Sequence, residues 1–111
     1  MMLYELRIYH IATGKMEDIH NRFANYTLRL FAKHDMHVRD FWVETEPGHN
    51  RLCYVMEYPD RETRDRKIDA FRSDPEWIEV TAQSERRGPI VEKRESIFLK
   101  KAPFFPNNSS T

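Results

Sequence analysis

The stretch MHVRDFWVETEPGHNRLCYVMEYP, residues 36–59, decides the fold of this chain. Two runs rich in valine and aromatic residues flank residues 46–50, which include Pro47 and Gly48. Proline, glycine and asparagine are typical of tight connections between antiparallel strands, so the stretch predicts a β-hairpin. A hairpin alone is only marginally stable in water, and other elements must therefore cover one of its faces.

A second strand is predicted over residues 3–10, where side chains alternate with a period of two. We expect the row formed by Tyr4, Leu6 and Ile8 to pack on helices. The opposite row, formed by Glu5, Arg7 and Tyr9, needs either solvent or a polar cavity, because buried polar groups require partners.

A helix is predicted from residue 14 or 15 to about residue 33, with Thr13 as its N-cap. Apolar residues recur along it at spacings of three and four, which places them on one face. They are Met16, Ile19, Phe23, Tyr26 and Leu30, with Phe31 beside them.

The segment after the hairpin predicts a surface helix followed by a second helix. Asp60 is a candidate N-cap, Glu62 and Arg66 are spaced to form an ion pair, and Ile68 and Phe71 are the apolar anchors. The sequence SDPEW at 73–77 marks a new helix start, because it combines a capping aspartate with a proline at the first helical position.

The last strand is predicted over residues 90–101, with Arg94, Ser96 and Phe98 on one side and Val91, Ile97 and Leu99 on the other. Residues 1–102 form one domain, and residues 103–111 form a tail. Phe104 and Phe105 are expected to lie across their own sheet or a partner subunit, and the final five residues are expected to be disordered.

This order of elements, strand, helix, two strands, broken helix and strand, predicts an α+β fold of the ferredoxin-like split βαβ type. It has a four-stranded antiparallel sheet with helices on one face. The bare face of the hairpin would present Trp42, Tyr54 and Met56 or Val55. A second copy of the sheet can cover them, so we expect a homodimer through the sheet faces.

Short charged and aromatic pieces are distributed over nearly the whole chain. They are YELRIY (4–9), GK (14–15), FW (41–42), TE (45–46), EY (57–58), RDR (64–66), DPEW (74–77) and PF (103–104). In this order and spacing they resemble the NIPSNAP domain family, although residues 48–50 depart from its usual pattern. The resemblance implies a dimeric α+β barrel with an interior pocket, and it supplies no catalytic residues.

Glu5, Arg7 and Tyr9 are the candidate catalytic residues, because a carboxylate beside a guanidinium can orient a small polar ligand or hold a proton-transfer group. The alternative for the same row is an ion pair between subunits. The candidate pocket lining, whose aromatic members are also consistent with simple core packing, consists of Trp42, Tyr54, Met56, Arg94 and Ser96.

No cofactor or metal is expected. His34 and His37 lack a third ligand at a recognisable spacing, so the sequence predicts no metal site. His20 is a weak candidate for a haem ligand by analogy with the wider barrel superfamily, and a half-buried structural histidine is the alternative. Cys53 is the only cysteine, and its apolar strand predicts a buried, inert thiol.

Composition excludes several function classes. Eighteen basic and eighteen acidic residues cancel, so no overall field attracts nucleic acid or an anionic membrane. No run is long and apolar enough to span a bilayer, and we expect a cytoplasmic protein.

The favoured function is binding of a small, partly apolar molecule in a homodimer. The alternatives are a monooxygenase or isomerase and a protein-interaction scaffold.

Overall fold

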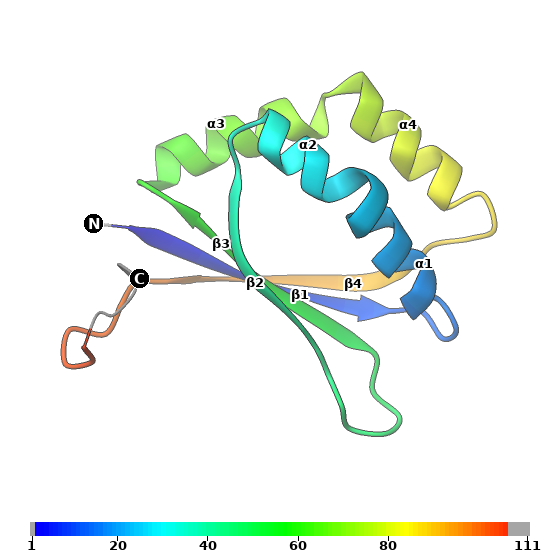
Figure 1. The fold of residues 1–111 in the computed structure, drawn as a ribbon, viewed down its shortest axis with the longest axis horizontal. Coiled ribbons are helices and arrows are strands. Elements are labelled where there is room, and N and C mark those ends of the chain that lie inside the picture. The colour runs from blue at the N-terminus through cyan, green and yellow to red at the C-terminus, as the bar shows by residue number, and fades with distance from the viewer. Residues whose placement is uncertain (1, 107–111) are drawn as a thin grey trace.

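The computed structural model describes residues 2–106 of the 111-residue chain. Its single sheet has the strand order β2-β3-β1-β4, with every neighbouring pair antiparallel. All helices lie on one side of this sheet (Figure 1). The predicted ferredoxin-like α+β arrangement is confirmed. In chain order the elements are β1 (Leu3–Ile11), α1 (Met16–Arg22), η1 (Phe23–Thr27), α2 (Leu28–Lys33), β2 (His37–Val43), β3 (Arg51–Tyr58), α3 (Arg61–Arg72), α4 (Pro75–Ser84) and β4 (Val91–Leu99).

The hairpin forms as predicted from β2 and β3. Gly48 lies in the connection between the two strands with a φ of 82°, a backbone conformation that residues other than glycine rarely adopt. The register places Phe41 opposite Tyr54 and Trp42 opposite Cys53, with an irregularity between Val38 and Asp40.

The two faces of β1 are the reverse of the prediction. Glu5 and Tyr9 face the helices and are 0% and 9% exposed, whereas Leu6 and Ile8 lie on the open face. Opposed residues of antiparallel strands share a face, and Arg7 lies opposite Tyr54. The helices therefore cover a row whose polar groups have partners among themselves and on α3.

The predicted bare face of the hairpin is corrected in the same way. Tyr54 and Met56 are 3% and 2% exposed and pack under the helices. Trp42 is 51% exposed on the opposite face, which Cys53 and Val55 share. Because strand side chains alternate between the two faces, Trp42 is separated from Tyr54 and Met56, whereas the alternative residue Val55 lies on its face as predicted.

The first helix contains a wide π-helical turn, η1, between α1 and α2. This turn rotates the following residues, so Thr27 is 2% exposed whereas Tyr26, predicted to lie on the apolar face, is 45% exposed. The Thr27 hydroxyl donates to the backbone oxygen of Arg22 at 3.2 Å. The N-cap position is Lys15, without a side-chain hydrogen bond, so the predicted Thr13 cap is wrong.

The starts of α3 and α4 follow the sequence signals. Asp60 accepts a hydrogen bond from the Thr63 backbone amide at 2.7 Å, and Asp74 accepts one from the Glu76 amide at 2.9 Å. Phe71 is buried and Ile68 packs against the core, as predicted. The ion pair with i, i+4 spacing on α3 joins Arg61 to Asp65 at 3.0 Å, in place of the predicted pair of Glu62 with Arg66.

The last strand carries Arg94, Ser96 and Phe98 on the helix-facing side, opposite Tyr9, Arg7 and Glu5. Ile97 and Leu99 lie on the open face, but Val91 does not join them. A register shift between His10 and Ile11 places Val91 opposite Ile11, where it is buried under the helices.

Phe104 and Phe105 are 86% and 70% exposed, so the prediction that they pack on their own sheet is wrong. Residues 103–105 form a turn beyond the end of β4 (Figure 1). Contact with a partner subunit stays a prediction, and the predicted disorder of the final five residues concerns positions outside the described range. Within that range, no helix is both long and apolar enough to cross a membrane.

Candidate functional site

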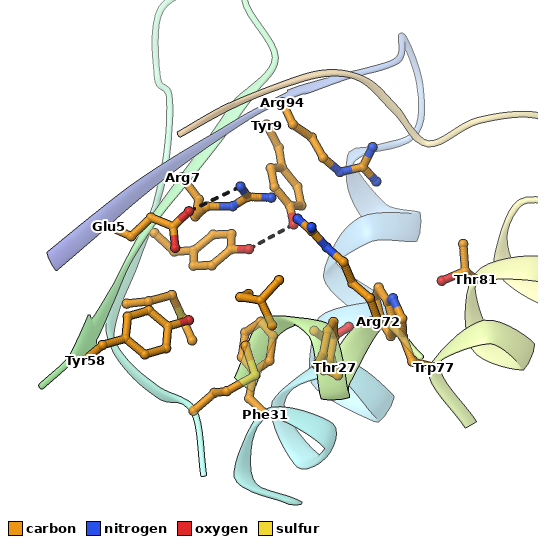
Figure 2. A pocket seen from close by; sticks show the side chains of 15 residues that line it. Glu5, Arg7, Tyr9, Thr27, Phe31, Tyr58, Arg72, Trp77, Thr81 and Arg94 are labelled. Carbon is orange, nitrogen blue, oxygen red and sulfur yellow. Dashed lines mark hydrogen bonds and ion pairs between the residues drawn. The ribbon is translucent and has the colours of Figure 1, made fainter. Parts of the chain in front are cut away.

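A cavity of about 330 Å3 lies between the sheet and the helices. Its size falls in the lower part of the range of small-molecule pockets, about 300–1,000 Å3. Polar side chains from the strands form one side of the cavity, here called its roof: Glu5, Arg7, Tyr9, Tyr54 and Arg94. The aromatic and aliphatic side chains of α2, α3 and α4 form most of the opposite wall (Figure 2). The apolar lining includes Phe31, Met56, Ile68, Phe71 and Trp77, and the charged lining consists of Glu5, Arg7, Arg72 and Arg94.

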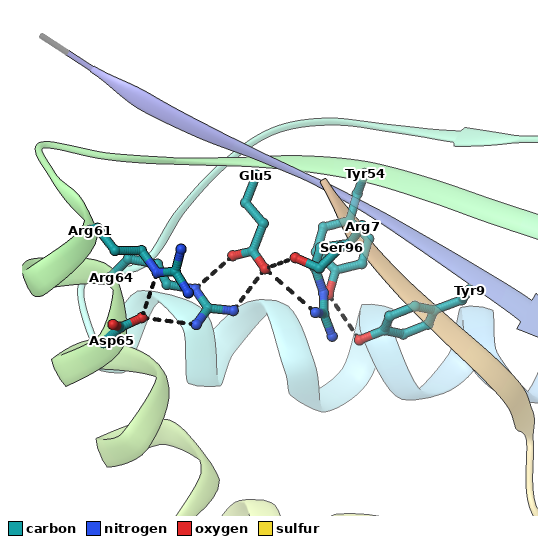
Figure 3. A network of polar contacts seen from close by, with 8 residues as sticks. All are labelled: Glu5, Arg7, Tyr9, Tyr54, Arg61, Arg64, Asp65 and Ser96. Carbon is teal, nitrogen blue, oxygen red and sulfur yellow. Dashed lines mark hydrogen bonds and ion pairs between the residues drawn. The ribbon is translucent and has the colours of Figure 1, made fainter. Parts of the chain in front are cut away.

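Glu5 is the centre of a network of polar contacts on the roof (Figure 3). Arg64 on α3 donates two parallel hydrogen bonds to its carboxylate, from Nε at 2.9 Å and from Nη2 at 2.7 Å. The Ser96 hydroxyl also donates to it, and Arg7 Nη1 lies 3.5 Å from Oε2. Both carboxylate oxygens are therefore occupied by neighbouring side chains.

Burial raises the pKa of Glu5, but hydrogen bonds from Arg64 and Ser96 and the charges of Arg64 and Arg7 outweigh it, so its pKa lies below the ordinary value. The carboxylate is ionised at neutral pH and already accepts several hydrogen bonds. Its Oε2 atom accepts from Arg64, Ser96 and Arg7, and its Oε1 atom accepts from Arg64, so Glu5 holds both arginines in place.

Tyr9 and Tyr54 form a buried phenol pair, with their hydroxyl oxygens 2.8 Å apart. The Arg7 guanidinium lies beside both, 5.6 Å from the Tyr9 ring centroid. Burial and the neighbouring Tyr9 raise the pKa of Tyr54 well above its ordinary value. Burial also raises the pKa of Tyr9, but Arg7 and the Tyr54 hydrogen bond reverse this and lower it. Either hydroxyl can donate this hydrogen bond to the other.

Two buried polar atoms of the lining have no hydrogen-bond partner among residues 2–106. They are the hydroxyls of Tyr58 and Thr81, and both atoms are buried. Burial and the nearby Glu5 carboxylate raise the pKa of Tyr58 to about 12, so its hydroxyl stays protonated. Buried hydroxyls without partners cost stability, and each can donate to or accept from a molecule in the cavity.

The structure brings most of the predicted site residues together. Glu5, Arg7, Tyr9, Tyr54, Met56 and Arg94 all line the cavity. Ser96 does not line the cavity, but its hydroxyl donates to Glu5, which does. Trp42 does not line it either, because it lies on the other face of the sheet, in a shallow surface hollow with Tyr4 and Val55.

Sequence reasoning missed Tyr58 and the arginines of α3. Arg64, Ile68 and Arg72 are spaced four residues apart, which places them on one face of the helix. The abundance of charge in this segment indicated a solvated surface instead. The recurrence of arginine at the spacing of the apolar anchor was the signal that could have revealed them.

The histidines and Cys53 lie outside the cavity. His20 is exposed on α1 and contributes nothing to the lining, so its placement does not fit a haem bound in this cavity. His34 pairs with Asp74 at 2.7 Å, whereas His37 pairs with Asp35 at 3.1 Å. No group of three metal-ligating side chains occurs within the described residues.

Cys53 is half-buried on the open face, opposite Trp42, and is not fully buried as predicted. Burial raises the pKa of its thiol, which keeps it protonated at neutral pH.

Comparisons with known proteins agree with this architecture. The family model described as NIPSNAP matches residues 4–106. An uncharacterised NIPSNAP domain protein from Burkholderia xenovorans is 26% identical with a TM-score of 0.80, covering 95% of this chain and 99% of its own.

Two more distant solved structures share only the fold. SnoaB, a cofactor-independent oxygenase from Streptomyces nogalater, has a TM-score of 0.60 at 14% identity, covering 96% of this chain and 98% of its own. A dimeric protein of unknown function with a ferredoxin-like fold from Bacteroides fragilis has a TM-score of 0.57 at 15% identity, covering 90% and 96%. No curated protein matches the chain. Because the family model spans almost the whole sequence, the chain belongs to the NIPSNAP family.

Proposed function

We propose that this protein binds a small, partly apolar molecule in the cavity between its sheet and its helices. The observation that carries the proposal is a cavity of about 330 Å3 whose apolar wall faces a polar roof. Pockets for small molecules combine these features, because apolar contact provides affinity and a few polar groups fix orientation. The unpaired hydroxyls of Tyr58 and Thr81 add two groups that a ligand can satisfy.

The first prediction is that a panel of small acids and hydrophobic carbonyl compounds contains a ligand that raises the thermal midpoint of the wild-type protein. A ligand at about 100 times its Kd stabilises a protein by about 2.7 kcal/mol. Arg7→Ala is expected to weaken binding of that ligand about tenfold or more, because Arg7 is the guanidinium held on the roof by Glu5.

Arg66→Ala is the matched control, since this arginine is exposed on α3 and does not line the cavity. Titration calorimetry on the three proteins separates the outcomes. A panel without a hit removes the support for binding, and a hit that binds Arg7→Ala as well as the wild type shows that Arg7 is not the recognition residue.

We also propose that a second copy of the chain covers the open face of the sheet. Six apolar side chains lie side by side there: Leu6, Ile8, Trp42, Val55, Ile97 and Leu99. Trp42, Ile97 and Leu99 are 51%, 44% and 43% exposed, and a contiguous exposed apolar surface of this kind is typical of an interface. The dimeric relative from Bacteroides fragilis supports pairing between chains of this fold.

A second candidate function is proton-transfer catalysis by an oxygenase or isomerase without a cofactor. The phenol pair favours it, because Arg7 lowers the pKa of Tyr9 and thereby stabilises the negative charge of a phenolate beside the cavity. The fold shared with a cofactor-independent oxygenase is consistent with this chemistry.

For this candidate we expect the protein to exchange protons next to the carbonyl group of a bound ketone with deuterium from D2O. The rate, followed by NMR, is expected to fall about 100-fold in Tyr9→Phe, since general acid–base groups contribute factors of about 10² to 10⁴. Tyr26→Phe is the control, because Tyr26 is exposed on the outer helix surface. Equal rates with and without protein would leave binding as the sole function.

A further inference from the structure

We propose that the ligand of the cavity is a small monocarboxylic acid, whose carboxylate lies among Arg7, Arg72 and Arg94 and whose apolar body lies against Phe71 and Trp77. This inference rests on the proposed binding function and adds the chemical class and the orientation of the ligand. It is carried by the charge distribution of the lining and by the positions of the three guanidinium groups.

The lining is positive although the chain as a whole has a formal net charge of zero. It contains three arginines and one carboxylate, Glu5. Glu5 is already neutralised by Arg64, which holds it through two hydrogen bonds from outside the cavity. The positive charges of the three lining arginines are therefore left without a dedicated counter-charge.

The ion-pair partners of the lining arginines support the conclusion that these charges are not neutralised. Arg7 reaches a carboxylate only at 3.5 Å, on the oxygen of Glu5 to which Arg64 and Ser96 also donate. Among residues 2–106, no carboxylate lies within 4.0 Å of the guanidinium of Arg72 or Arg94. Each of these groups therefore keeps donors that a ligand can occupy.

Two of the three guanidinium groups lie near the same phenol ring. Those of Arg7 and Arg94 lie 5.6 and 5.2 Å from the ring centroid of Tyr9. Arg72 extends from α3 into the same cavity (Figure 2). The Arg7 side chain is only 13% exposed, whereas Arg72 and Arg94 are exposed residues. An anion placed between these groups would supply the counter-charge that they lack.

The geometry and size favour a carboxylate over a larger or doubly charged group. Guanidinium groups bind carboxylates through paired hydrogen bonds in one plane. The rest of the lining is mostly apolar, so only one end of the ligand is charged. A cavity of about 330 Å3 holds the volume of roughly ten water molecules at ~30 Å3 each, which suits an acid of about that many non-hydrogen atoms.

The experiment compares phenylacetate and 3-phenylpropionate with their neutral amides by titration calorimetry on the full chain. Each acid matches its amide in shape, so the comparison isolates the charge. We expect at least one acid to bind about tenfold or more tightly than its amide, and its affinity to fall with added salt. Phenyl phosphate is included to distinguish a carboxylate site from a general anion site.

Variants then assign the charge effect to residues. Arg72→Gln and Arg94→Gln are each expected to weaken binding of the acid about tenfold and to leave amide binding within about threefold. Arg66→Gln removes the same charge from an exposed position of α3 and is expected to leave both unchanged. Arg7 is tested separately by Arg7→Ala, and Arg72 and Arg94 add two positions that make no hydrogen bond to Glu5.

The outcomes are distinct. If an acid and its amide bind equally, the anion inference is wrong and the cavity proposal stands. If neither class binds but the wider panel yields another ligand, the acid inference is wrong and the binding proposal stands; if the panel is empty as well, both fail. Tighter binding of phenyl phosphate than of either acid would replace the carboxylate by a phosphate ester. Equal losses for acid and amide in the arginine variants would show that these arginines only maintain the shape of the cavity.

Discussion

Replacing Glu5 with glutamine is expected to lower the free energy of unfolding by about 3 kcal/mol. Glu5 is 0% exposed, and its carboxylate is the common acceptor for Arg64, Ser96 and Arg7. Glutamine keeps the shape but removes the charge, and its amide group points two donors at guanidinium donors. Breaking a buried ion pair by removing one partner costs about 3–5 kcal/mol, because the remaining charge is left uncompensated.

Urea unfolding followed by circular dichroism at fixed protein concentration measures this loss. Glu62→Gln is the matched control, since Glu62 is exposed on α3, and surface substitutions change stability by about 0.5 kcal/mol or less. A loss below about 1 kcal/mol in Glu5→Gln would contradict the account of Glu5 as the group that holds the roof of the cavity together.

The same substitution has a defined pH dependence. The pKa of Glu5 is lower in the folded chain than its ordinary value of 4.5, so near that pH the unfolded chain binds more protons. The contribution of Glu5 is complete above this value and decreases as pH falls toward the folded-state pKa. The difference between wild type and Glu5→Gln is therefore expected to be constant near neutral pH and to shrink below about pH 4.5.

Leu6→Glu is expected to convert the proposed dimer, of twice 13.4 kDa, into a monomer at micromolar concentration. Leu6 is central on the open face, between Val55 of β3 and Ile97 of β4. In a sheet-to-sheet dimer the two new carboxylates would be buried without partners, at a cost of several kcal/mol each. A loss of about 3 kcal/mol weakens association more than 100-fold.

Light scattering at several concentrations measures the mass, and circular dichroism checks that the variant keeps its fold. Ile78→Glu introduces the same charge on α4, where Ile78 is 55% exposed, and is expected to leave the mass unchanged. Dissociation by Ile78→Glu but not by Leu6→Glu would move the interface to the helices. A wild-type mass of 13.4 kDa would remove the dimer proposal altogether.

The parts of the fold that follow from local rules were predictable. The hairpin connection around Gly48 and the caps at Asp60 and Asp74 each depend on residues within a few positions of one another. The rotation of the first helix was not, because the π-helical turn that buries Thr27 and exposes Tyr26 leaves no mark in the apolar spacing.

The candidate site was also predictable only in part. The period of two in β1 placed Glu5, Arg7 and Tyr9 in one row, and they do share a face. Which face the helices cover was not encoded in that period, because both rows of the strand contain large apolar or aromatic groups. The partners that make burial of the polar row tolerable, Arg64 and Tyr54, come from other elements.

By itself, then, the sequence determined the order of elements, the ferredoxin-like topology and the residue types available for a site. Secondary-structure propensity and the alternation of side chains depend on residues that are close in the chain, so the sequence alone specifies them. Only the tertiary structure decided that the polar row turns inward to roof a cavity and that Trp42 lies on the opposite face. The physical reason is that burial of a charge is decided by whether distant side chains supply its hydrogen bonds, as Arg64 and Ser96 do for Glu5.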